Sequence, residues 1–359
     1  MPQGTTNMQP SGEPRRWTSR PEGATWGDFG PQDQVGRLNL LTPEKVRQGI
    51  AEVKEGRTFC LSLPLDYPGG SVLSPRRYPP VLRPTVRNGK VNWNYNFADD
   101  DPQRRDLVCD DAVVLHTHYS THWDAFCHVG HLFDVKGDGA LEPVYYNGYR
   151  AGRDIVGPGR LDDAGSVGTF EAQATSQARA LGIDKMAATC VQGRAVLIDL
   201  HKHFGSQRTL VGYDELMRVL DADRIVVETG DMVCLHTGFA QMLLEMNKQP
   251  DEHLKASCAA LDGRDDRLLA WISASGLCTL IADNFAVEAL PPEPESPLHG
   301  PALACHCLFK PGVHLGELWH LTPLAAWLGS CGRSWFLLTA PPLRLPGASG
   351  SPVTPVATV

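Results

Sequence analysis

The sequence predicts a single α/β domain, and its apolar runs, the segments between them and its length support this fold class. Four apolar runs have the length of buried strands: residues 194–200, 231–237, 277–283 and 334–339. Three further segments are expected to be helices: residues 214–220, 251–260 and 266–275. The chain has 359 residues, of which 42% are hydrophobic, and this is enough for a sizeable core. No internal repeat and no clear interdomain linker divides it, so one domain is favoured.

The remaining elements follow in order along the chain. Residues 1–24 are rich in Pro, Gly, Ser and Thr, which predicts a flexible N-terminal arm or an arm packed on a neighbour. A Thr-Pro-Glu start predicts a helix over about residues 42–53. Residues 64–106 form a long excursion with several aromatic side chains, which predicts either a lid or wall over a substrate or a packed surface loop. We assign the domain to residues 25–340 and expect a loosely ordered tail at 341–359.

The composition argues against several classes of partner. A formal net charge of −8 without a basic stripe argues against nucleic-acid binding. No run approaches the ~18 apolar residues of a membrane span, and residues 1–20 lack the apolar core of a secretion signal. Ten cysteines without Cys-x-x-Cys spacing indicate reduced, buried thiols. We therefore expect a cytoplasmic protein with a small-molecule substrate, and we also expect a homo-oligomer, either a dimer or a tetramer.

Histidine gathers in one short stretch of the chain. Five of the 13 histidines lie within residues 116–131, and residues 118–128 have the sequence HYSTHWDAFCH. Neutral imidazoles together with a carboxylate suit a divalent ion such as Zn²⁺ or Mn²⁺. The alternative is a His-rich surface loop that binds nothing. The apolar run at 112–115 and the Trp, Ala, Phe and Cys inside the stretch indicate burial, where imidazoles need partners.

The spacing of His118, His122 and Asp124 fits neither regular element. On a helix, Asp124 would point away from the face that the two histidines share. On a strand all three would share a face, but His118 and His122 would be roughly 13 Å apart at ~3.3 Å per residue. We therefore expect a strand that ends near His118, a tight turn at residues 120–121 and a helix that starts near Asp124. That helix would bring His128 back over Asp124.

These residues carry a resemblance to a known family. The pattern His-x-Gly-Thr-His-x-Asp-x-Pro-x-His marks the "putative cyclase" family of metal-dependent hydrolases, to which bacterial-type kynurenine formamidase, isatin hydrolase and trans-dienelactone hydrolase belong or lie close. Residues 118–128 are similar to it, with Ser120 in place of Gly and Phe126 in place of Pro. Shorter matches follow in the family's order: residues 26–30, 36–39, 41–44, 146–149, 193–199, 230–231, 283, 287–288 and 316–318. The resemblance covers about residues 25 to 330.

The resemblance implies a swivelling β/β/α fold and a site for one or two divalent ions, Zn or Mn. His118, His122 and Asp124 would be ligands, and Asp124 would bridge two ions if a second one binds. Three protein ligands leave a position open for water, which is typical of a catalytic site. His128 would move a proton from water to the leaving group; the alternative is that it is a further ligand or orients one. Thr121 is expected to form the turn or a hydrogen bond and not to act as a nucleophile.

A second group of candidate ligands lies near the carboxyl end of the chain. Glu317 matches the family's glutamate well, and the family pairs that glutamate with a preceding histidine. Counting back without gaps reaches Ala304, so the histidine does not match cleanly. His306 requires a short deletion and His299 a larger insertion, and both alternatives stay open.

The ligand set indicates hydrolysis. A bound Zn²⁺ lowers the pKa of water from about 15.7 towards about 7 and polarises a carbonyl group. We therefore predict a metal-dependent hydrolase, of amidohydrolase or lactonase type, that opens an amide, imide or lactone bond in a small cyclic or aromatic compound. The alternatives are a non-catalytic metal-binding protein of the same fold and a non-haem iron oxygenase. Five aromatic residues are candidates either for a flat pocket or for the core: Trp93, Tyr95, Phe97, Trp123 and Phe126.

Overall fold

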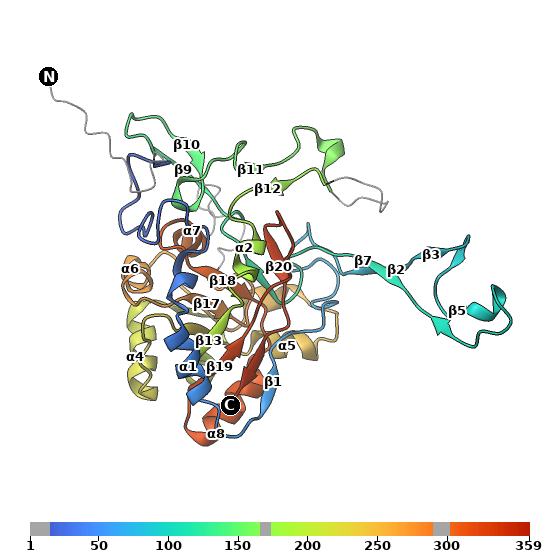
Figure 1. The fold of residues 1–359 in the computed structure, drawn as a ribbon. Helices are drawn as coiled ribbons and strands as arrows, with labels where there is room; N and C mark the ends of the chain where they lie inside the picture. The colour runs from blue at the N-terminus through green and yellow to red at the C-terminus, as the bar shows by residue number, and fades with distance from the viewer. Residues whose placement is uncertain (1–14, 166–173, 290–301) are drawn as a thin grey trace.

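The computed structural model describes residues 15–165, 174–289 and 302–359. A nine-stranded sheet forms the centre of the molecule, with helices packed around it (Figure 1). In sheet order its strands are β1 (Thr58–Cys60), β21 (Val356–Thr358), β19 (Trp335–Thr339), β13 (Gln192–Asp199), β15 (Met232–His236), β17 (Thr279–Ala282), β18 (His314–Glu317), β8 (His122–Asp124) and β20 (Gly350–Pro352). This arrangement confirms the predicted α/β class.

The middle of the sheet is parallel and buried. β13, β15, β17 and β18 run parallel to one another, and antiparallel strands continue the sheet on both sides. Continuous apolar runs are what strands buried on both faces require. All four predicted strands are confirmed, since the apolar runs form β13, β15, β17 and β19.

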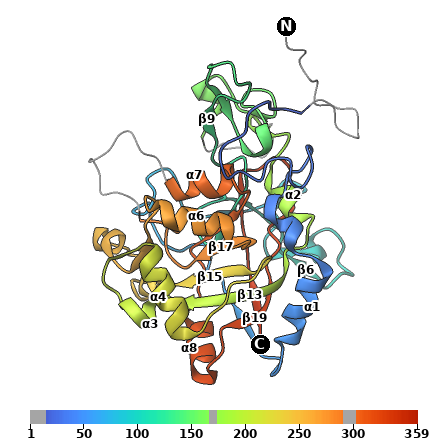
Figure 2. The same cartoon turned by 90° about the vertical axis from the view of Figure 1, so that its left-hand side faces the viewer.

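Eight α-helices lie in the described part of the chain: α1 (Pro43–Ala51), α2 (Ile183–Ala187), α3 (Leu200–Phe204), α4 (Tyr213–Asp223), α5 (Phe239–Glu245), α6 (Asp266–Ala274), α7 (Ala302–Phe309) and α8 (Thr322–Cys331). α1 packs across β13 and β19, α7 packs on β18, and α6 contacts both α4 and α7 (Figure 2). The Thr42 hydroxyl accepts the Lys45 N–H and caps α1, which confirms the helix predicted there. α4 and α6 confirm two of the other predicted helices.

The helix predicted at 251–260 is wrong. Asp251 caps only the short 3₁₀ helix η5 (Glu252–Ala256), and the chain then extends into the buried strand β16 (Ala259–Leu261). β16 pairs in parallel with β14 (Thr209–Val211), so tertiary pairing overrides the local preference for helix. A further 3₁₀ helix, η1 (Gly36–Leu40), precedes α1.

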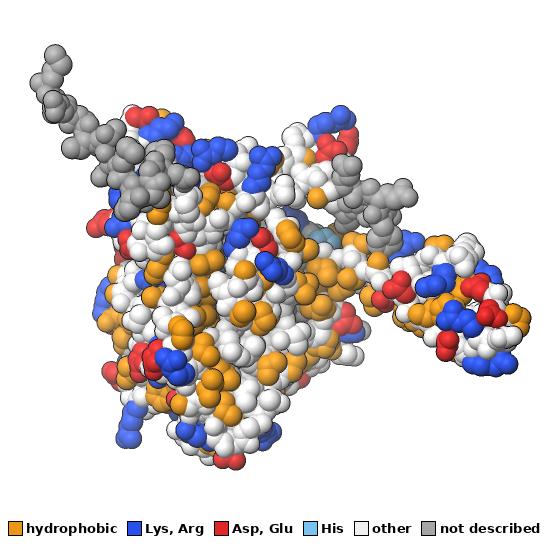
Figure 3. Space-filling view, viewed as in Figure 1, with side chains coloured by type: hydrophobic (Ala, Val, Ile, Leu, Met, Phe, Trp, Pro, Cys, Tyr) orange, Lys and Arg blue, Asp and Glu red, His pale blue; other side chains and the backbone are white. Residues whose placement is uncertain are grey.

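Residues 81–114 form a narrow arm that extends away from the body (Figure 1). Its base is the antiparallel pair β2 (Val81–Pro84) and β7 (Asp111–Val114). Its outer part holds β3 (Val86–Arg87), β4 (Lys90–Val91), β5 (Tyr95–Asn96), η2 (Phe97–Asp99) and β6 (Leu107–Val108). Apolar side chains such as Leu82 and Val86 are exposed on it (Figure 3). The predicted excursion at 64–106 begins before the observed arm does. Leu73, which lies inside the predicted range, is buried in a core cluster with Phe239 and belongs to the body of the molecule.

The N-terminal segment packs on a small lobe of this same chain. The lobe holds β9 (His131–Phe133), β10 (Glu142–Val144), η3 (Tyr146–Gly148), β11 (Ile155–Val156), η4 (Leu161–Asp163) and β12 (Gln177–Ala178). Trp17 is buried edge-to-face on Trp26, with ring centroids 5.9 Å apart, and Arg16 stacks over Tyr149. The flexible arm predicted at 1–24 is therefore wrong from Arg16 onwards, and residues 1–14 lie outside the described part.

The carboxyl-terminal segment is built into the sheet. β20 pairs with β8, and β21 lies between β1 and β19. The side chains of Ala357 and Val359 are fully buried. The prediction of a loosely ordered tail at 341–359 is therefore wrong. Its Pro- and Gly-rich composition suggested disorder, but backbone pairing with other strands orders two short strands within it.

Two further predictions concern the cysteines and the possibility of a membrane-spanning helix. All ten cysteines are free thiols, of which five are buried and four are exposed. Within the three described ranges, no helix has both the length and the apolar character that a membrane crossing requires.

Candidate metal centre

Strand β8 presents His122 and Asp124 on one face, because side chains alternate along a strand. Trp123 points to the other face and packs edge-to-face on Trp319, with ring centroids 5.0 Å apart. β18 pairs antiparallel with β8 in a register that puts Glu317 opposite His122. His122 Nε2 lies 3.4 Å from Asp124 Oδ1 and 3.6 Å from Glu317 Oε2. The pairing of two short strands thus brings three ligand-type side chains together.

His118 approaches the same carboxylate from the loop between β7 and β8. Its Nε2 lies 3.4 Å from Asp124 Oδ1. Gly350 of β20 pairs with Asp124, and a Cβ added to Gly350 would be 2.2 Å from His118 Nε2. A side chain at position 350 would therefore enter the space of the imidazole. Because His118 lies on a loop and not on β8, the long separation expected along one strand does not arise.

His128 lies on a turn directly after β8. Its N–H donates to Ala125 O at 2.9 Å and closes that turn. Its ring stacks on His118 with centroids 4.3 Å apart, and its Nε2 lies 3.9 Å from Asp124 Oδ1. The helix predicted to start near Asp124 is therefore wrong, but the expected approach of His128 to Asp124 is achieved by a strand and a turn.

Two groups of ligand atoms share Asp124. His118, Asp124 and His128 form one group, and His122, Asp124 and Glu317 form the other; within each group the ligand atoms lie within 4.8 Å of one another. The sequence suggests His118, His122 and Asp124 as one set, whereas the structure divides the two histidines between the groups. This is the geometry in which Asp124 could bridge two ions.

The atoms that face one another here are buried and lack hydrogen bonds. His118 Nε2, His122 Nε2 and Asp124 Oδ1 have no hydrogen-bond partner among the described residues. Such atoms are costly to bury, so a cation that accepts their lone pairs would be stabilising. His122 Nδ1–H donates to Ser120 O at 2.7 Å, which leaves the Nε2 lone pair directed towards the carboxylates. These residues fit a divalent cation.

The pKa values of the buried groups support the same conclusion. Burial, together with the Asp124 charge, raises the pKa of Glu317 to about 7. At Asp124 burial acts upward, but the imidazoles of His128, His122 and His118 outweigh it and lower the pKa. Burial lowers the pKa of His118, while at His122 the Asp124 carboxylate outweighs burial and raises the pKa. Two carboxylates buried this close together favour an added positive charge.

The loop after β17 approaches Glu317 in a conformation that is rare for its residues. Ala286 has φ +77° and Val287 has φ +54°, although neither is glycine and valine is β-branched. Such residues cost on the order of 1–3 kcal/mol each and persist where the surrounding structure holds them. The backbone N–H of Ala286 donates to the Glu317 carboxylate, which favours its charged form.

The carboxyl-terminal histidine of the predicted site is not found with the other ligands. His306 lies on α7, where Nε2 is 2.8 Å from Ser273 Oγ of α6. Burial lowers the pKa of His306 to about 4, so the ring is a neutral member of the helix packing. The structure thus does not bring His306 to Glu317. The alternative candidate, His299, lies outside the described residues.

Two buried residues support the site without facing the ligand groups. His314 of β18 lies three positions before Glu317 and so faces the other side of the sheet, where it stacks on Phe126 with centroids 3.9 Å apart. Its Nδ1–H donates to the Asp124 carbonyl at 2.9 Å and holds the β8 backbone. Thr121 accepts the Leu63 N–H at 2.9 Å, consistent with the hydrogen-bonding role expected for it. The odd spacing between positions 314 and 317 is the sequence signal that separates His314 from the ligands.

The aromatic candidates fall into the core and the arm. Trp123 and Phe126 are fully buried in the core, whereas Trp93 is half exposed on the arm. Tyr95 and Phe97 contact each other on the arm, with ring centroids 5.7 Å apart.

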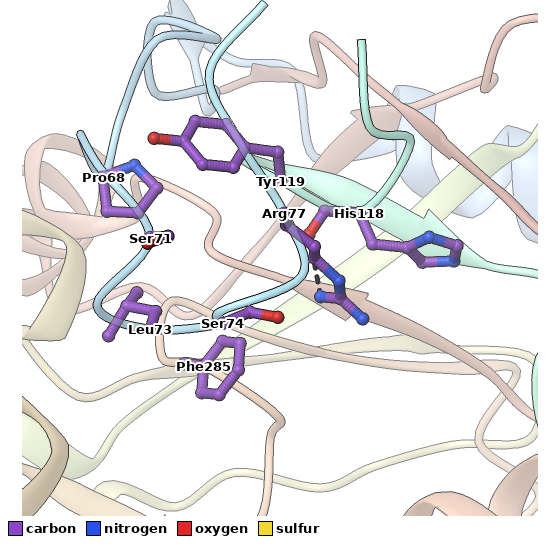
Figure 4. Close-up of a pocket in the computed structure, with 8 residues that line it drawn as sticks. All are labelled: Pro68, Ser71, Leu73, Ser74, Arg77, His118, Tyr119 and Phe285. Atoms are coloured by element: carbon purple, nitrogen blue, oxygen red, sulfur yellow. Dashed lines mark hydrogen bonds between the residues drawn. The ribbon is translucent and has the colours of Figure 1, made fainter. Parts of the chain in front are cut away.

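A pocket beside His118 is lined by residues of the excursion predicted at 64–106, none of which the sequence singled out individually. They come from the loop before the arm and include Leu73, Ser74 and Arg77, with Phe285 of the loop after β17 beside them (Figure 4). Arg77 Nη1 donates to the His118 carbonyl at 2.8 Å. Residues 76 and 77 are both arginine, so the sequence alone does not show which of the two side chains contacts His118.

Comparison with known proteins identifies similar sequences and folds. The family model described as "Putative cyclase" matches residues 61–289. A crystal structure described as a novel cyclase has 26% sequence identity and a TM-score of 0.69, and the match covers 94% of this chain and 97% of that chain. No curated protein matches the chain.

Two solved isatin hydrolases share the fold at lower identity. Isatin hydrolase A from Labrenzia aggregata, bound to benzyl benzoate, has 13% identity and a TM-score of 0.52, with 87% of this chain and 98% of that chain covered. An isatin hydrolase bound to the product analogue thioisatinate has 14% identity and a TM-score of 0.51, with 89% and 99% covered. The predicted cyclase-like fold is confirmed.

Proposed function

This chain belongs to the "putative cyclase" family, and on that premise we propose that it is a metal-dependent hydrolase that opens an amide, imide or lactone bond in a small cyclic or aromatic compound. One observation carries the proposal. His118 Nε2, His122 Nε2 and Asp124 Oδ1 converge in a buried space without hydrogen-bond partners in the described part of the chain. A structural ion would be enclosed by four protein ligands, whereas neither group offers more than three, so positions stay open for water and substrate.

His118 and His122 would hold one or two divalent ions together with Asp124 and Glu317. Imidazole and carboxylate ligands suit Zn²⁺ and Mn²⁺. Such an ion supplies Lewis acidity, since it lowers the pKa of water and polarises a carbonyl group. Glu317, whose pKa is raised to about 7 by burial and by Asp124, would be ionised by the added charge.

His128 is the group best suited to accept and return a proton. Its side chain is 29% exposed, whereas His122 is 1% exposed, so His128 faces the open side of the site. Burial lowers the pKa of His128, so its ring is neutral at pH 7 and Nε2 can accept a proton from water. Stacking on His118 holds the ring in position. The proton would return from Nε2 to the leaving group.

A non-catalytic metal-binding protein is the second candidate. One observation favours it: His306 contacts Ser273 and not Glu317, so the carboxyl-terminal half supplies Glu317 alone within the residues that the structure describes.

Two measurements test the proposal. Elemental analysis of the purified protein should find one or two equivalents of Zn or Mn per chain. A panel of simple lactones, cyclic imides and formanilides should then include at least one compound that is hydrolysed, with the rate lost after chelation and restored by the ion. A stoichiometric ion without turnover would favour the second candidate, and oxygen consumption would point to an iron oxygenase.

A further inference from the structure

The arm at residues 81–114 is almost entirely exposed to solvent. Within it, only Asn92 and Tyr95 are buried. Its strands form three two-stranded pairs, β2–β7, β3–β4 and β5–β6, which are separate from the central sheet. An isolated two-stranded pair is at best marginally stable in water, and each ordered residue costs about 1–2 kcal/mol of backbone entropy. Among the described residues, the arm therefore has few of the buried contacts that would hold it in this form.

The base of the arm carries apolar side chains on both of its faces. In the pairing of β2 with β7, Leu82 lies opposite Val113, and Val81 lies opposite Val114. Neighbouring residues on a strand point to opposite faces, so each face of the ribbon holds one of these apolar pairs. Leu82 is 67% exposed and Val81 is 54% exposed (Figure 3). A ribbon that only water surrounds is expected to be polar on at least one face, so this pattern indicates a partner surface.

The root of the arm is fixed to the body. Arg77 Nη1 donates to the His118 carbonyl at 2.8 Å, and the Tyr78 N–H donates to His116 Nδ1 at 3.2 Å. These bonds join the two legs of the arm just before β2 and just after β7. The arm therefore leaves the body in a set direction (Figure 1), which reduces the cost of ordering it when a partner binds.

The charged side chains of the arm are of both signs. Residues 81–114 include five Arg and Lys residues and six Asp residues. Arg104 stacks over the Phe97 ring at 3.7 Å. Lys90 pairs with Asp99 at 3.3 Å, so cations and carboxylates are mixed along the surface. Nucleic acids and anionic membranes attract clustered cations, which a mixed surface does not provide. Two copies of a mixed surface, by contrast, can align opposite charges when one is turned against the other.

We propose that a second copy of this chain docks on the arm, so that the protein is a homodimer, or a tetramer of such pairs, in which each arm lies against the other copy. A twofold contact uses the same surface twice, so an apolar ribbon provides its own complement. A standard interface takes about 20–30 residues from each partner, which residues 81–114 can supply. Leu82 and Val113 would be buried in this contact. The inference does not depend on the proposed hydrolase function.

Sedimentation of the purified protein at micromolar concentration tests the inference. The wild type should sediment as a dimer or tetramer. Leu82→Lys places a charge in the apolar contact and should raise the dissociation constant of the pair by about 30-fold or more, the effect of losing a central interface residue. Val113→Lys, on the facing strand, should act in the same way. Both side chains are exposed in the single chain, so the fold should persist, and circular dichroism checks this.

Val226→Lys is the matched control. Val226 is 64% exposed, close to the value for Leu82, but it lies on the body between α4 and β15. This variant gains the same charge and should sediment as the wild type does. A monomeric wild type would overturn the inference, and would leave the arm to a partner of another kind. An assembly that persists in both the Leu82→Lys and the Val113→Lys variants would place the contact elsewhere and would also overturn it.

Cys109 gives an independent readout on the arm itself. It is an exposed free thiol, and so is Cys331 at the end of α8. Iodoacetamide should alkylate Cys109 more slowly in the assembled wild type than in the Leu82→Lys variant, because the second copy covers the arm. Cys331 should react equally in both proteins, and peptide mass spectrometry measures the two rates separately. Equal rates for Cys109 in both proteins would contradict a contact at the arm.

Discussion

His122 of β8 and Glu317 of β18 face each other across one strand pair, with 3.6 Å between Nε2 and Oε2. Neither atom can move far, because both side chains are buried and both backbones belong to the central sheet. The pair therefore holds two ligand atoms at a fixed separation before any ion arrives, which reduces the cost of ordering them.

The first prediction concerns His122. His122→Ala removes a ligand atom and should abolish metal binding in its group and reduce hydrolysis to background. The melting temperature in the presence of the ion should also fall, because an ion that binds only the folded state stabilises it by about 2.7 kcal/mol at 100 times its Kd. Elemental analysis and thermal melts measure both effects. His131→Ala, at an exposed histidine outside both groups, should behave as the wild type. Full metal content in His122→Ala would contradict the site.

The second prediction separates the two possible roles of His128. His128→Asn should leave metal content unchanged and lower kcat by about 10²–10⁴-fold, the usual contribution of a positioned acid–base group. Metal content and steady-state rates are measured on the same preparation. If metal and activity fall together, His128 is a ligand in the group that it forms with His118 and Asp124.

The third prediction compares Glu317 with His306. Glu317→Gln keeps the shape of the side chain but removes its charge, so it should weaken metal affinity, most clearly for a second ion. His306→Ala should not change metal content, because His306 contacts Ser273 on α6. Competition with a chromophoric chelator gives both affinities. Loss of metal from the His306 variant would mean that α7 moves towards the site when an ion binds.

The fourth prediction concerns Gly350. A Cβ at this position would lie 2.2 Å from His118 Nε2, so Gly350→Ala should displace the imidazole and weaken metal binding. Overpacking of this kind costs about 1–3 kcal/mol of unfolding free energy, which denaturant titration measures. Gly329→Ala is the control, because nothing lies within 4 Å of a Cβ there and α8 would gain a better helix former. Normal metal affinity in Gly350→Ala would show that His118 is not a ligand.

The fifth prediction is a pH dependence of stability away from the metal centre. His236 Nδ1 lies 2.8 Å from Asp199 Oδ1. Burial would lower the pKa of His236, but the Asp199 hydrogen bond and the Asp283 and Asp199 charges outweigh it and raise the pKa above 6.5. At Asp199, burial is outweighed in the same way by His236, and the pKa falls below 3.8.

The sign of this dependence follows from the two directions. The pair contributes its full stability between an unfolded-state aspartate pKa of about 3.9 and an unfolded-state histidine pKa of about 6.5. Its contribution is lost as pH rises through the raised pKa of His236, and also as pH falls through the lowered pKa of Asp199. Asp199→Asn retains the cap of α3 and removes the charge, so it should cost roughly 1.5–3 kcal/mol near pH 5.5 and less above the His236 pKa. A difference between the variant and the wild type that is constant from pH 5.5 to pH 9 would contradict this assignment.

The central strands and the first helix could be predicted because their signals are local. A strand buried on both faces must be apolar throughout, and Thr42 before Pro43 is a complete cap by itself. Glu317 could be singled out by its family match, but its position opposite His122 depends on a register that no local pattern contains. The structure of the two ends of the chain was harder to predict from the sequence. Trp17 is held by packing on Trp26, and β21 is held by pairing with β19, and neither contact leaves a local pattern in the sequence.

The local structure of the histidine segment was predicted less well than its chemistry. His128 approaches Asp124 as expected, but through a strand and a turn and not through a helix. Asp124 could cap a helix, but β8 pairs with β18 on one edge and with β20 on the other, and this pairing keeps the backbone at Asp124 extended. Arg77 could not be distinguished from Arg76 by sequence, because only the fold of the preceding loop turns one of them towards His118.

The position of β8 between β18 and β20 has a consequence for the order of folding. β8 is made early in synthesis, whereas both of its neighbours lie near the carboxyl end; His314, which holds the Asp124 carbonyl, is 190 residues further along the chain. Contacts that close such long loops form slowly, and amino-terminal segments are exposed first as a chain is synthesised. The histidine segment therefore cannot pair with β18 and β20 until nearly the whole chain has been synthesised. Early capture of an ion by the segment alone would involve His118, His122, Asp124 and His128 without Glu317, so the full ligand set belongs to the last stage of folding.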